Sequence, residues 1–504
     1  CLCRTGNHTS LTMNRRQFLA STSLAAGAIV TGCTTTTPAV RFTPKSRVIG
    51  ANDDIRVAVV GFNSRGNDHI AGFKKLKGVR LVALCDVDSK VLEKGRADLA
   101  KDGIQVETYT DVRKLLESGE IDAVSTATPN HWHALLATWA CQAGKDVYVE
   151  KPVSHNVWEG RQIVAAARKY GRIVQTGTQC RSNPGLREAI AWLHEGNLGQ
   201  IQVARGLCYK PRQSIGNVTA PTQVADHINY DLWCGPSPLK PLMRSKLHYD
   251  WHWQFITGNG DLGNQGIHQM DIARWALGAN TLSPKVFSVG GRLGYQDNGD
   301  TPNSQFVYHQ YEKASLIFEV RGLPKSKEYQ DARWTKSMPE YRGAQVGVVI
   351  HCENGYMVIP SYDSAKAFDK NGREIKAWKQ SADHYANFVA AVRSRRSSDL
   401  NAEILEGHLS SALCHTGNIS YQLGKKLTPE AIRERLQDSP DAAESFSRLS
   451  EHLIANGINL EAQPLVLGET LRMDVKTEKF IRNDRANQLL TREYRKGFEV
   501  PSRV

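Results

Sequence analysis

Apolar, β-branched runs of strand length alternate with amphipathic helical patterns along the first third of the chain. The runs occupy residues 56–60, 79–87, 121–128, 145–149 and 173–177. Short apolar runs of this kind predict strands, and the 3.6-residue patterns between them predict helices. Because alternating strands and helices build a parallel sheet covered on both faces, residues 55–177 are predicted to form a doubly wound α/β domain.

A different pattern begins at residue 178. Strand-like runs now follow one another with turn residues between them, at residues 201–207, 285–291, 305–311, 315–320, 345–352 and 356–359. Helical patterns occur at residues 267–277, 384–395 and 403–423. Strands grouped in this way and flanked by helices predict an α+β domain over residues 178–427. Residues 428–504 are predicted to be a charged helical appendage and tail, in which we recognise no chemistry.

The N-terminal residues indicate export. Residues 14–19 (Asn-Arg-Arg-Gln-Phe-Leu) precede an apolar stretch at residues 24–30, a pattern that resembles a twin-arginine signal starting at Met13. The stretch is too short for a permanent membrane-spanning helix. Cys33 ends a Val-Thr-Gly-Cys sequence that resembles a bacterial lipoprotein cleavage box. We therefore predict a leader over residues 1–33, a linker over residues 34–54, and a protein that is periplasmic or anchored facing the periplasm.

Composition excludes several classes of partner. The formal charge of +13 on 504 residues is spread among acidic residues, without a basic run interleaved with aromatic side chains, so no nucleic-acid partner is predicted. Contact with a membrane is predicted only through the leader or a lipid anchor. No Cys-x-x-Cys pair occurs, and the histidines lack tight ligand spacing with carboxylates, so no metal site is predicted.

A glycine-bearing turn after the first strand predicts a dinucleotide site. It reads Gly61, Phe62, Asn63, Ser64, Arg65, Gly66. In the dinucleotide fingerprint the first glycine makes the tight turn, the middle position, here Asn63, faces the pyrophosphate, and the last glycine lets helix and strand pack closely. Asp86 ends the second strand 20 residues after Gly66, a spacing that suits a carboxylate binding ribose hydroxyls. Its charge would repel a 2′-phosphate, which favours NAD over NADP.

Two further strand exits carry candidate side chains at the edge where doubly wound sheets bind ligands. Thr128, Asn130 and His133 follow one strand, and we predict that they contact the cofactor; the alternative for His133 is a helix start. Glu150 and Lys151 follow the next strand and are also cofactor candidates. A lysine held beside a cofactor loses hydration, so its pKa falls toward neutrality, which suits proton transfer. Lys151 is therefore the first candidate for the chemistry.

Four motifs, in this order, resemble the Gfo/Idh/MocA oxidoreductase family over about residues 55–421. They are the turn at residues 61–66, Thr-Pro-Asn-x-x-His at 128–133, Glu-Lys-Pro at 150–152, and Gly-Asn-Gly-Asp-Leu-Gly-Asn-Gln-Gly-Ile-His at 258–268. The resemblance implies an N-terminal Rossmann domain that binds NAD, followed by an α+β domain with an open, mostly antiparallel sheet. It also implies a homo-oligomer, because this sheet commonly serves as an interface in the family.

The resemblance assigns roles to three residues. Lys151 corresponds to a lysine that contacts the nicotinamide ribose and the substrate, and His268 corresponds to the proton donor or acceptor at the reacting hydroxyl. Asn264 stands where the polyol dehydrogenases often have an aspartate, and asparagine cannot take a proton at neutral pH. A proton relay must then rest on His268 and Lys151 or use another group, which departs from a standard inositol-type dehydrogenase.

The loops between the two domains supply hydrogen-bonding groups and flat faces on which a sugar ring can stack. From them we select as substrate residues Arg181, Tyr209, His248 and Trp251. Further candidates of the same kind are Gln179, Lys210, Arg212, Tyr249, His252 and Trp253. For each of them the alternative to substrate binding is a structural role in the core or an exposed position on the surface without a function. The predicted partner is a small carbohydrate or polyol.

Together these features predict an exported NAD-dependent oxidoreductase acting on a hydroxyl of a sugar, glycoside or polyol. Because an exported enzyme lacks a known supply of NAD, we expect the cofactor to stay bound, with more than about 8 kcal/mol of binding, and to be reduced and reoxidised within one turnover. Such a cycle gives glycoside cleavage, epimerisation or hydride transfer between two sugars. The alternatives are a simple NAD-dependent sugar or cyclitol dehydrogenase and a non-catalytic carbohydrate-binding lipoprotein.

Overall fold

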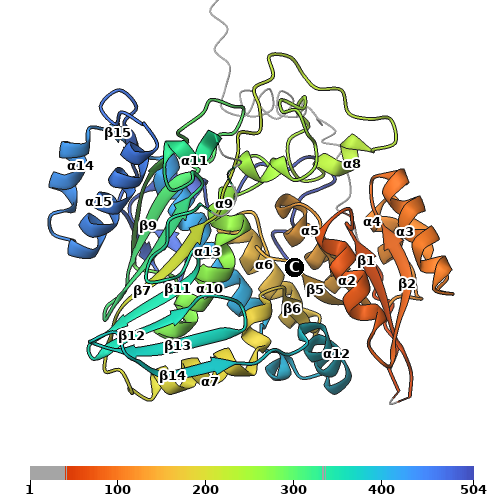
Figure 1. The fold of residues 1–504 in the computed structure, drawn as a ribbon. Helices are drawn as coiled ribbons and strands as arrows, with labels where there is room; N and C mark the ends of the chain where they lie inside the picture. The colour runs from red at the N-terminus through yellow and green to blue at the C-terminus, as the bar shows by residue number, and fades with distance from the viewer. Residues whose placement is uncertain (1–39, 41, 51, 332–333, 335–336) are drawn as a thin grey trace, which may run out of the picture. The chain divides into compact units, whose positions relative to one another are not determined.

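A computed structural model describes residues 40, 42–50, 52–331, 334 and 337–504 of the chain (Figure 1). The predicted export signal and the predicted lipidation site at Cys33 lie outside the described residues. In the part that is described, no helix is both long and apolar enough to cross a membrane. The same residues contain no group of three or more His, Cys, Asp or Glu side chains placed to hold a metal ion.

The N-terminal domain is built on a six-stranded parallel sheet with the order β3-β2-β1-β4-β5-β6. Its strands are β1 (Ile55–Val60), β2 (Val79–Cys85), β3 (Glu107–Tyr109), β4 (Ala123–Thr126), β5 (Asp146–Val149) and β6 (Val174–Thr176). Its helices are α2 (Arg65–Lys74), α3 (Ser89–Lys101), α4 (Val112–Leu116), α5 (Asn130–Gln142) and α6 (Val157–Lys169). Strands β1, β4 and β5 are buried along their whole length, as expected for a sheet with helices on both faces. The prediction of a doubly wound domain is confirmed.

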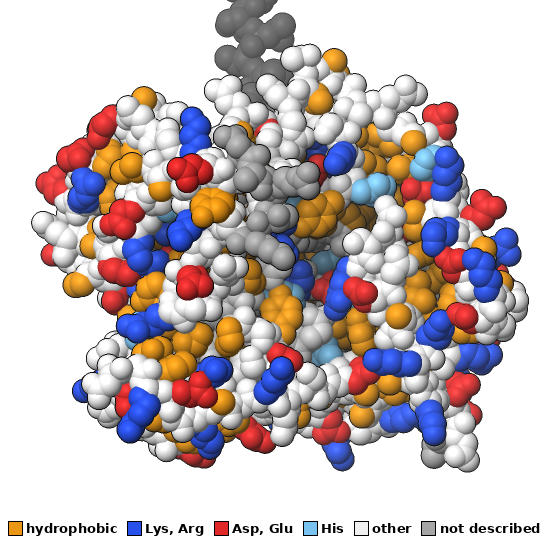
Figure 2. All heavy atoms as spheres, in the orientation of Figure 1, with side chains coloured by type: hydrophobic (Ala, Val, Ile, Leu, Met, Phe, Trp, Pro, Cys, Tyr) orange, Lys and Arg blue, Asp and Glu red, His pale blue; other side chains and the backbone are white. Residues whose placement is uncertain are grey.

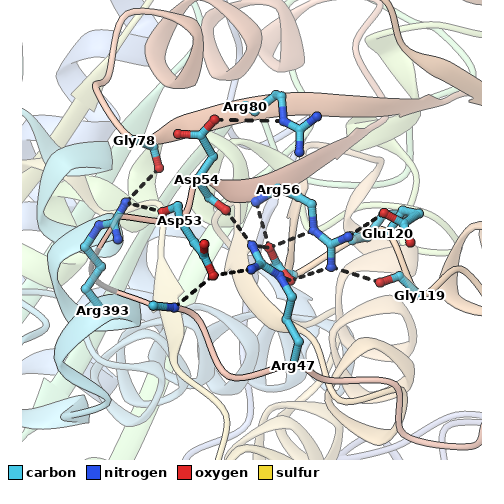
Figure 3. Close-up of polar contacts among 12 residues, drawn as sticks. Arg47, Asp53, Asp54, Arg56, Gly78, Arg80, Gly119, Glu120 and Arg393 are labelled. Carbon is cyan, nitrogen blue, oxygen red and sulfur yellow. Dashed lines mark hydrogen bonds and ion pairs between the residues drawn. The ribbon is translucent and has the colours of Figure 1, made fainter.

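An ionic cluster fastens the segment before β1 to the amino-terminal edge of this sheet (Figure 3). The buried Asp122 carboxylate accepts hydrogen bonds from the guanidinium groups of both Arg47 and Arg56, at 2.9 to 3.2 Å. Arg47 also pairs with Asp53 at 2.6 Å. Because Arg56 is the second residue of β1 and Gly61 follows the end of β1, the cluster and the predicted nucleotide turn lie at opposite edges of the sheet.

The second domain contains a 12-stranded sheet with the main order β14-β13-β12-β11-β7-β10-β9-β8-β16-β15. The strands are β7 (Ile201–Tyr209), β8 (Lys285–Gly291), β9 (Ser304–Gln310), β10 (Ser315–Arg321), β11 (Val346–Cys352), β12 (Gly355–Ile359), β13 (Ser364–Asp369), β14 (Glu374–Lys379), β15 (Lys425–Leu427), β16 (Leu465–Leu467), β17 (Leu471–Asp474) and β18 (Lys479–Phe480). Neighbouring strands are antiparallel except β7 and β10. The predicted mostly antiparallel sheet is confirmed.

Helices cover both faces of this sheet (Figure 1). On the side toward the Rossmann domain, α7 (Pro184–His194), α10 (Gly266–Leu277) and α13 (Ile404–Gln422) share one apolar core with the sheet. On the other side, α14 (Pro429–Leu436) and α15 (Pro440–Ala455) pack over β8, β9 and β10. The remaining helices are α8 (Tyr230–Cys234), α9 (Gly260–Asn264), α11 (Lys327–Asp331), α12 (His384–Ser394) and α16 (Asp484–Gln488).

The C-terminal region differs from the helical appendage and tail expected for residues 428–504. It contains α14, α15 and α16, but β16 and β17 also pair with β8 and extend the sheet. These strands have only three and four residues, too few for a recognisable period in the sequence. Residues 489–504, which we call the C-terminal strap, then return to the Rossmann domain, where Phe498 and Val500 enter its core.

Charged side chains of both signs are interspersed on the face drawn in Figure 2, where Lys and Arg lie among Asp and Glu. The formal charge of +13 therefore does not gather into one basic band on that face. A backbone-binding groove for nucleic acid needs such a band.

Candidate active site

A cavity of about 430 Å³ lies at the carboxyl edge of the Rossmann sheet. One wall carries the turn after β1, Asp86, Thr128 and Lys151. The opposite wall comes from the second domain, beginning at Lys210 and ending at Gln265. Ligands of doubly wound sheets bind outside the carboxyl ends of the strands, and this cavity occupies that position.

The nucleotide turn depends on two glycines. Gly61 has a φ of 74°, and a Cβ there would come within 2.8 Å of the Thr128 side chain. A Cβ on Gly66 would lie 2.2 Å from the carbonyl oxygen of Gly61, so α2 can pack against the strand end only with glycine at this position. Gly61 and Asn63 line the cavity, whereas Gly66 acts by packing behind it.

Asp86 lies at the exit of β2 with its carboxylate fixed. One carboxylate oxygen accepts the Phe62 N–H at 3.1 Å, and the other accepts the Asp88 N–H at 3.0 Å. Burial raises the pKa of Asp86, and these two N–H groups oppose the rise by favouring the charged form. Each oxygen retains a lone pair, and Asp86 lines the cavity, so the carboxylate fits the two hydroxyls of a ribose.

Lys151 lines the cavity at the exit of β5. Its Nζ donates a hydrogen bond to the backbone carbonyl of Asn264 at 2.8 Å. Burial lowers the pKa of Lys151, and the neighbouring Glu150 carboxylate only partly opposes this. Asn264 also lines the cavity, but its contact with Lys151 uses the backbone carbonyl, so an aspartate is not needed for that hydrogen bond.

Glu150 is buried beneath the cavity and does not line it, contrary to its predicted contact with the cofactor. Its carboxylate accepts hydrogen bonds from Arg65 Nε at 2.9 Å and from Gln179 at 3.1 Å, and lies 3.1 Å from His69 Nε2. Burial alone would raise its pKa, but the His69 contact and the Arg65 charge hold the pKa of Glu150 well below its usual range. The ion pair fixes α2 to the end of β5, and Arg65 reaches the cavity wall from it.

His268 is buried in the first turn of α10, with its ring 4.9 Å from the ring of Tyr362. Its Nδ1 has no hydrogen-bond partner among the described residues. Burial, followed by the positive charge of Lys151, lowers the pKa of His268 to about 3, so the ring is neutral at pH 7. His268 is not in the wall of the cavity, but it is close enough for the Lys151 charge to act on it.

Two residues predicted to contact the cofactor instead hold the loops together. The His133 ring nitrogens lie 2.6 Å from the carbonyl oxygen of Pro152 and 2.7 Å from that of Thr128, so both are engaged with backbone. Asn130 donates its amide to the side chain of Asn259 at 2.9 Å. Both side chains are buried, and neither lines the cavity.

The predicted substrate residues separate into two pairs. His248 and Trp251 line the cavity. Arg181 does not, because it makes a buried two-bond ion pair with Asp271 at 2.8 and 2.9 Å. Tyr209 is also directed elsewhere, since its hydroxyl donates to the buried Glu319 at 2.6 Å.

A segment of the second domain covers the cavity. We call residues 224–254 the cover segment; its residues that line the cavity are Leu232, Trp233, His248, Tyr249 and Trp251. Its backbone is hydrogen-bonded to the Rossmann domain, where Ser89 donates to His227 and Asn229 donates to Val87, both at 2.9 Å. The His227 ring also lies 2.8 Å from the Asp88 carboxylate.

Sequence reasoning missed several parts of this wall. Trp132 in α5, Leu232 and Trp233 in α8, and Gln265 all line the cavity. The five residues of α8 are too few for a helical period, and Trp132 within the apolar α5 looks like an ordinary core residue. Gln265 directly follows Asn264 in the motif at residues 258–268, and this position is the sequence feature that could have marked Gln265 as a cavity residue.

Comparison with known families agrees with this geometry. A model described as the oxidoreductase family, NAD-binding Rossmann fold, matches residues 55–178. A second model of the same family, described as its C-terminal alpha/beta domain, matches residues 199–342. Together they cover more than half of the chain. The chain belongs to the Gfo/Idh/MocA family of oxidoreductases. NAD is therefore its cofactor, and the Gly61 turn and the Asp86 carboxylate provide groups that fit it.

Individual relatives align with a smaller part of this Gfo/Idh/MocA chain than the two family models do. A glycosyl hydrolase family 109 protein of Shewanella sp. (strain W3-18-1) is 36% identical over 171 residues, which are 31% of this chain and 37% of that protein. Inositol 2-dehydrogenase 4 of Saccharopolyspora erythraea is 35% identical over 152 residues, 30% of this chain and 44% of the relative. The chain thus aligns with less than half of the length of these relatives.

The fold is shared with solved structures over most of its length. The WlbA dehydrogenase from Bordetella pertussis, solved in complex with NADH and UDP-GlcNAcA, superposes with a TM-score of 0.52 at 19% identity, covering 73% of this chain and 94% of that one. An oxidoreductase domain protein from Kribbella flavida gives a TM-score of 0.53 at 17% identity, covering 72% and 96%. Both likenesses concern the fold alone.

Proposed function

We propose that this protein oxidises a hydroxyl of a sugar, glycoside or polyol, and that its NAD stays bound through the catalytic cycle. The observation that carries the proposal is Lys151, a lysine with a lowered pKa in the wall of the nucleotide cavity, next to the neutral His268. When bound, NAD supplies the acceptor for a hydride from the CH–OH carbon. The chain itself must supply the group that takes the hydroxyl proton.

Lys151 is the better proton acceptor of the two side chains. A general base works best when its pKa is near the working pH. The pKa of His268 is lowered to about 3, which makes its ring a weak base, whereas burial lowers the pKa of Lys151 below that of an exposed lysine. We assign proton transfer to Lys151 and hydrogen bonding to the substrate hydroxyl to His268. Asn264 holds the Lys151 amine through its backbone carbonyl.

The cover segment supports retention of the cofactor. It lines one side of the cavity through Trp233 and Trp251, and two backbone hydrogen bonds join it to the Rossmann domain. We expect these contacts to slow the release of a dinucleotide. A retained cofactor has to be restored within each turnover, so that the hydride and proton taken from one carbon return to the same molecule or to a second sugar. Glycoside cleavage and epimerisation are net reactions of this kind.

The relatives support two forms of this activity: a redox-neutral glycoside cleavage and a simple oxidation. The Shewanella protein is named as a glycosyl hydrolase, in line with a redox-neutral cleavage. The Saccharopolyspora protein is named as an inositol 2-dehydrogenase, which favours simple oxidation of a cyclitol or sugar as the second candidate. Asn264, in the position where polyol dehydrogenases often carry aspartate, favours the first form. Export by the twin-arginine route remains part of the proposal, since it explains why retention would be useful.

One experiment tests the proposal. Protein purified without added nucleotide is denatured, and the released nucleotide is identified and quantified. The native protein is then incubated with glycosides and polyols without added cofactor, and products are followed by mass spectrometry. We expect about one NAD per chain and turnover without accumulation of NADH. Stoichiometric NADH from a single substrate would instead establish the simple dehydrogenase, and protein that contains no NAD and needs it added at substrate-like concentrations would refute retention.

A further inference from the structure

A second cleft adjoins the cofactor cavity at the end of the large sheet. We call it the Tyr362 cleft; it has a volume of about 700 Å³ and is open on one side. Its own walls include Tyr209, Pro211, Met338, Val346, Ser361 and Tyr362. They come together because β7 ends where β11 begins, with Cys208 paired to Val346, and because the turn after β12 lies beside them.

Only a few side chains separate the two spaces. Lys210 and Gln265 line both the cofactor cavity and the Tyr362 cleft. The Lys210 amine donates to the Gln265 side-chain oxygen at 3.2 Å, and the Gln265 amide donates to the Tyr362 hydroxyl at 2.5 Å. These are side-chain contacts between groups that can rotate, unlike the backbone hydrogen bonds that hold the cover segment.

The reacting position of the proposed function lies beside this boundary. Tyr362 is the aromatic side chain that contacts the His268 ring, at 4.9 Å between ring centroids. Lys151 lines the cofactor cavity on the other side, together with Gln265. A substrate hydroxyl held at Lys151 therefore lies in the cofactor cavity, whose Lys210 and Gln265 wall is shared with the Tyr362 cleft.

The chemistry of the cleft suits a sugar ring. Tyr362 is 37% exposed and presents an aromatic face, and Pro211 and Val346 add apolar surface. Ser361, Gln345 and the Lys210 amine supply hydrogen-bond donors and acceptors. Pockets for small molecules typically have volumes of about 300 to 1,000 Å³, and this cleft falls within that range in addition to the space for the cofactor.

We infer that the substrate is a glycan of at least two sugar units, whose reacting unit lies between Lys151 and His268 and whose neighbouring unit occupies the Tyr362 cleft. This inference rests on the proposed function, because it places the same reacting hydroxyl. It names Tyr362 and Val346 as residues that determine specificity for the second unit. The Lys210–Gln265 contact is the boundary that the substrate spans.

The test fills the cleft without touching the cofactor cavity. Val346→Trp places a large ring into the cleft from the start of β11, and Ser361→Trp does so from the turn after β12. Lys366→Trp is the matched control, because Lys366 is exposed on β13 and belongs to neither cavity. The probes are methyl glycosides of common hexoses and N-acetylhexosamines, and disaccharides that carry the same units. Binding to the NAD-containing protein is measured by calorimetry, and turnover is measured in parallel.

The unaltered protein should bind at least one disaccharide tenfold or more tightly than the matching methyl glycoside. Either cleft-filling variant should reduce this preference to within twofold, with unchanged NAD content and unchanged methyl glycoside affinity, while Lys366→Trp keeps it. Equal affinity for both ligand sizes in the unaltered protein would overturn the inference. A preference for the disaccharide that remains in a folded cleft-filling variant would also overturn the inference. Turnover tests the proposed function separately. A protein that prefers a disaccharide but does not turn it over would support a second sugar site in the Tyr362 cleft and contradict the proposed enzymatic activity.

Discussion

The two ends of the cofactor cavity are built differently. At the Asp86 end, packing and backbone contacts fix the walls: the Trp132 indole donates to the Leu232 carbonyl at 3.0 Å, and Phe498 of the C-terminal strap lies edge-on behind it at 5.7 Å. At the Lys151 end, the walls are polar side chains such as Lys210 and Gln265, linked by a 3.2 Å hydrogen bond. Rigid packing at the Asp86 end suits a cofactor that stays bound, and rotatable side chains at the Lys151 end suit a substrate that is exchanged in each turnover.

The electrostatics follow the same division. The Asp86 carboxylate is anchored by two backbone N–H groups, which do not move when a ligand binds. Lys151 is anchored by a single carbonyl, and burial lowers its pKa, so it can lose and regain a proton. We therefore expect substitutions at the two ends to separate cofactor binding from turnover.

Replacing Lys151 by alanine should give the largest effect. Removing a general base typically costs about 10²- to 10⁴-fold in rate, so kcat in Lys151→Ala should fall by this factor. NAD content per chain, measured after denaturation, should stay within about twofold because the Asp86 end is intact. Lys74→Ala is the control, since Lys74 is an exposed lysine paired with Asp102. A variant that loses NAD along with activity would show that the two ends are not independent.

Asp86→Asn should give the opposite result. An amide replaces one carboxylate oxygen by NH₂, so the side chain can no longer accept from both Phe62 and Asp88 and keep an acceptor for each ribose hydroxyl. Hydrogen bonds to a charged group contribute about 1.5 to 3 kcal/mol, so NAD affinity should fall about 10- to 100-fold, with kcat at saturating NAD little changed. Equilibrium titration with NAD and NADP measures this.

The matched control for that variant is Asp98→Asn, since Asp98 is an exposed carboxylate on α3 that pairs with Lys94 and Lys101. Its affinity for NAD should equal that of the unaltered protein. An Asp86→Asn protein that binds NAD normally would remove Asp86 from the cofactor site.

The sequence predicted the Asp86 end better than the rest. Strand, turn and acid follow one another within a single βα unit, so their geometry is local, and Gly61, Gly66 and Asp86 lie where the pattern expects. Arg181 and Tyr209, which do not line the cofactor cavity, have partners far along the chain: Arg181 pairs with Asp271, and the Tyr209 hydroxyl donates to Glu319. A motif does not reveal such pairs, because a buried arginine or tyrosine with a structural partner has the same residue type as one that binds a sugar.

The pH dependence of turnover should identify the proton acceptor. Burial lowers the pKa of Lys151 from 10.5, so its amine becomes neutral at a lower pH than an exposed lysine. If the neutral amine takes the hydroxyl proton, kcat rises about tenfold per pH unit below that lowered pKa and is constant above it. His268, with a pKa of about 3, stays neutral throughout and adds no inflection near 6.5.

The profile is measured from pH 6 to 10 with the unaltered protein and with His268→Gln. The rising limb should persist in His268→Gln, because Lys151 is unchanged. The absolute rate should be lower, because His268 no longer orients the hydroxyl. A limb centred near 6.5 that disappears in this variant would transfer the role of proton acceptor from Lys151 to His268.

The smallest effect is expected at the C-terminal strap. Arg495 donates to the Asp231 carbonyl at 3.0 Å, pairs with the Asp231 carboxylate, and lies over the Phe498 ring at 5.0 Å. Asp231 belongs to α8, which carries Leu232 and Trp233 in the cavity wall. Arg495→Gln should therefore loosen the cover segment at the Asp86 end. Because partly exposed ion pairs contribute about 0 to 1 kcal/mol, NAD release should accelerate by no more than about fivefold.

Release is followed by diluting protein loaded with radiolabelled NAD into unlabelled NAD. Arg433→Gln is the control, since it removes an exposed arginine that pairs with Glu430 within α14, which packs on the second sheet. If both variants release NAD at the same rate, the strap does not take part in retention, and the cover segment's own backbone contacts must suffice. If only Arg495→Gln is faster, and its kcat is unchanged, residues near the end of the chain act on the Asp86 end while leaving the Lys151 end as it was.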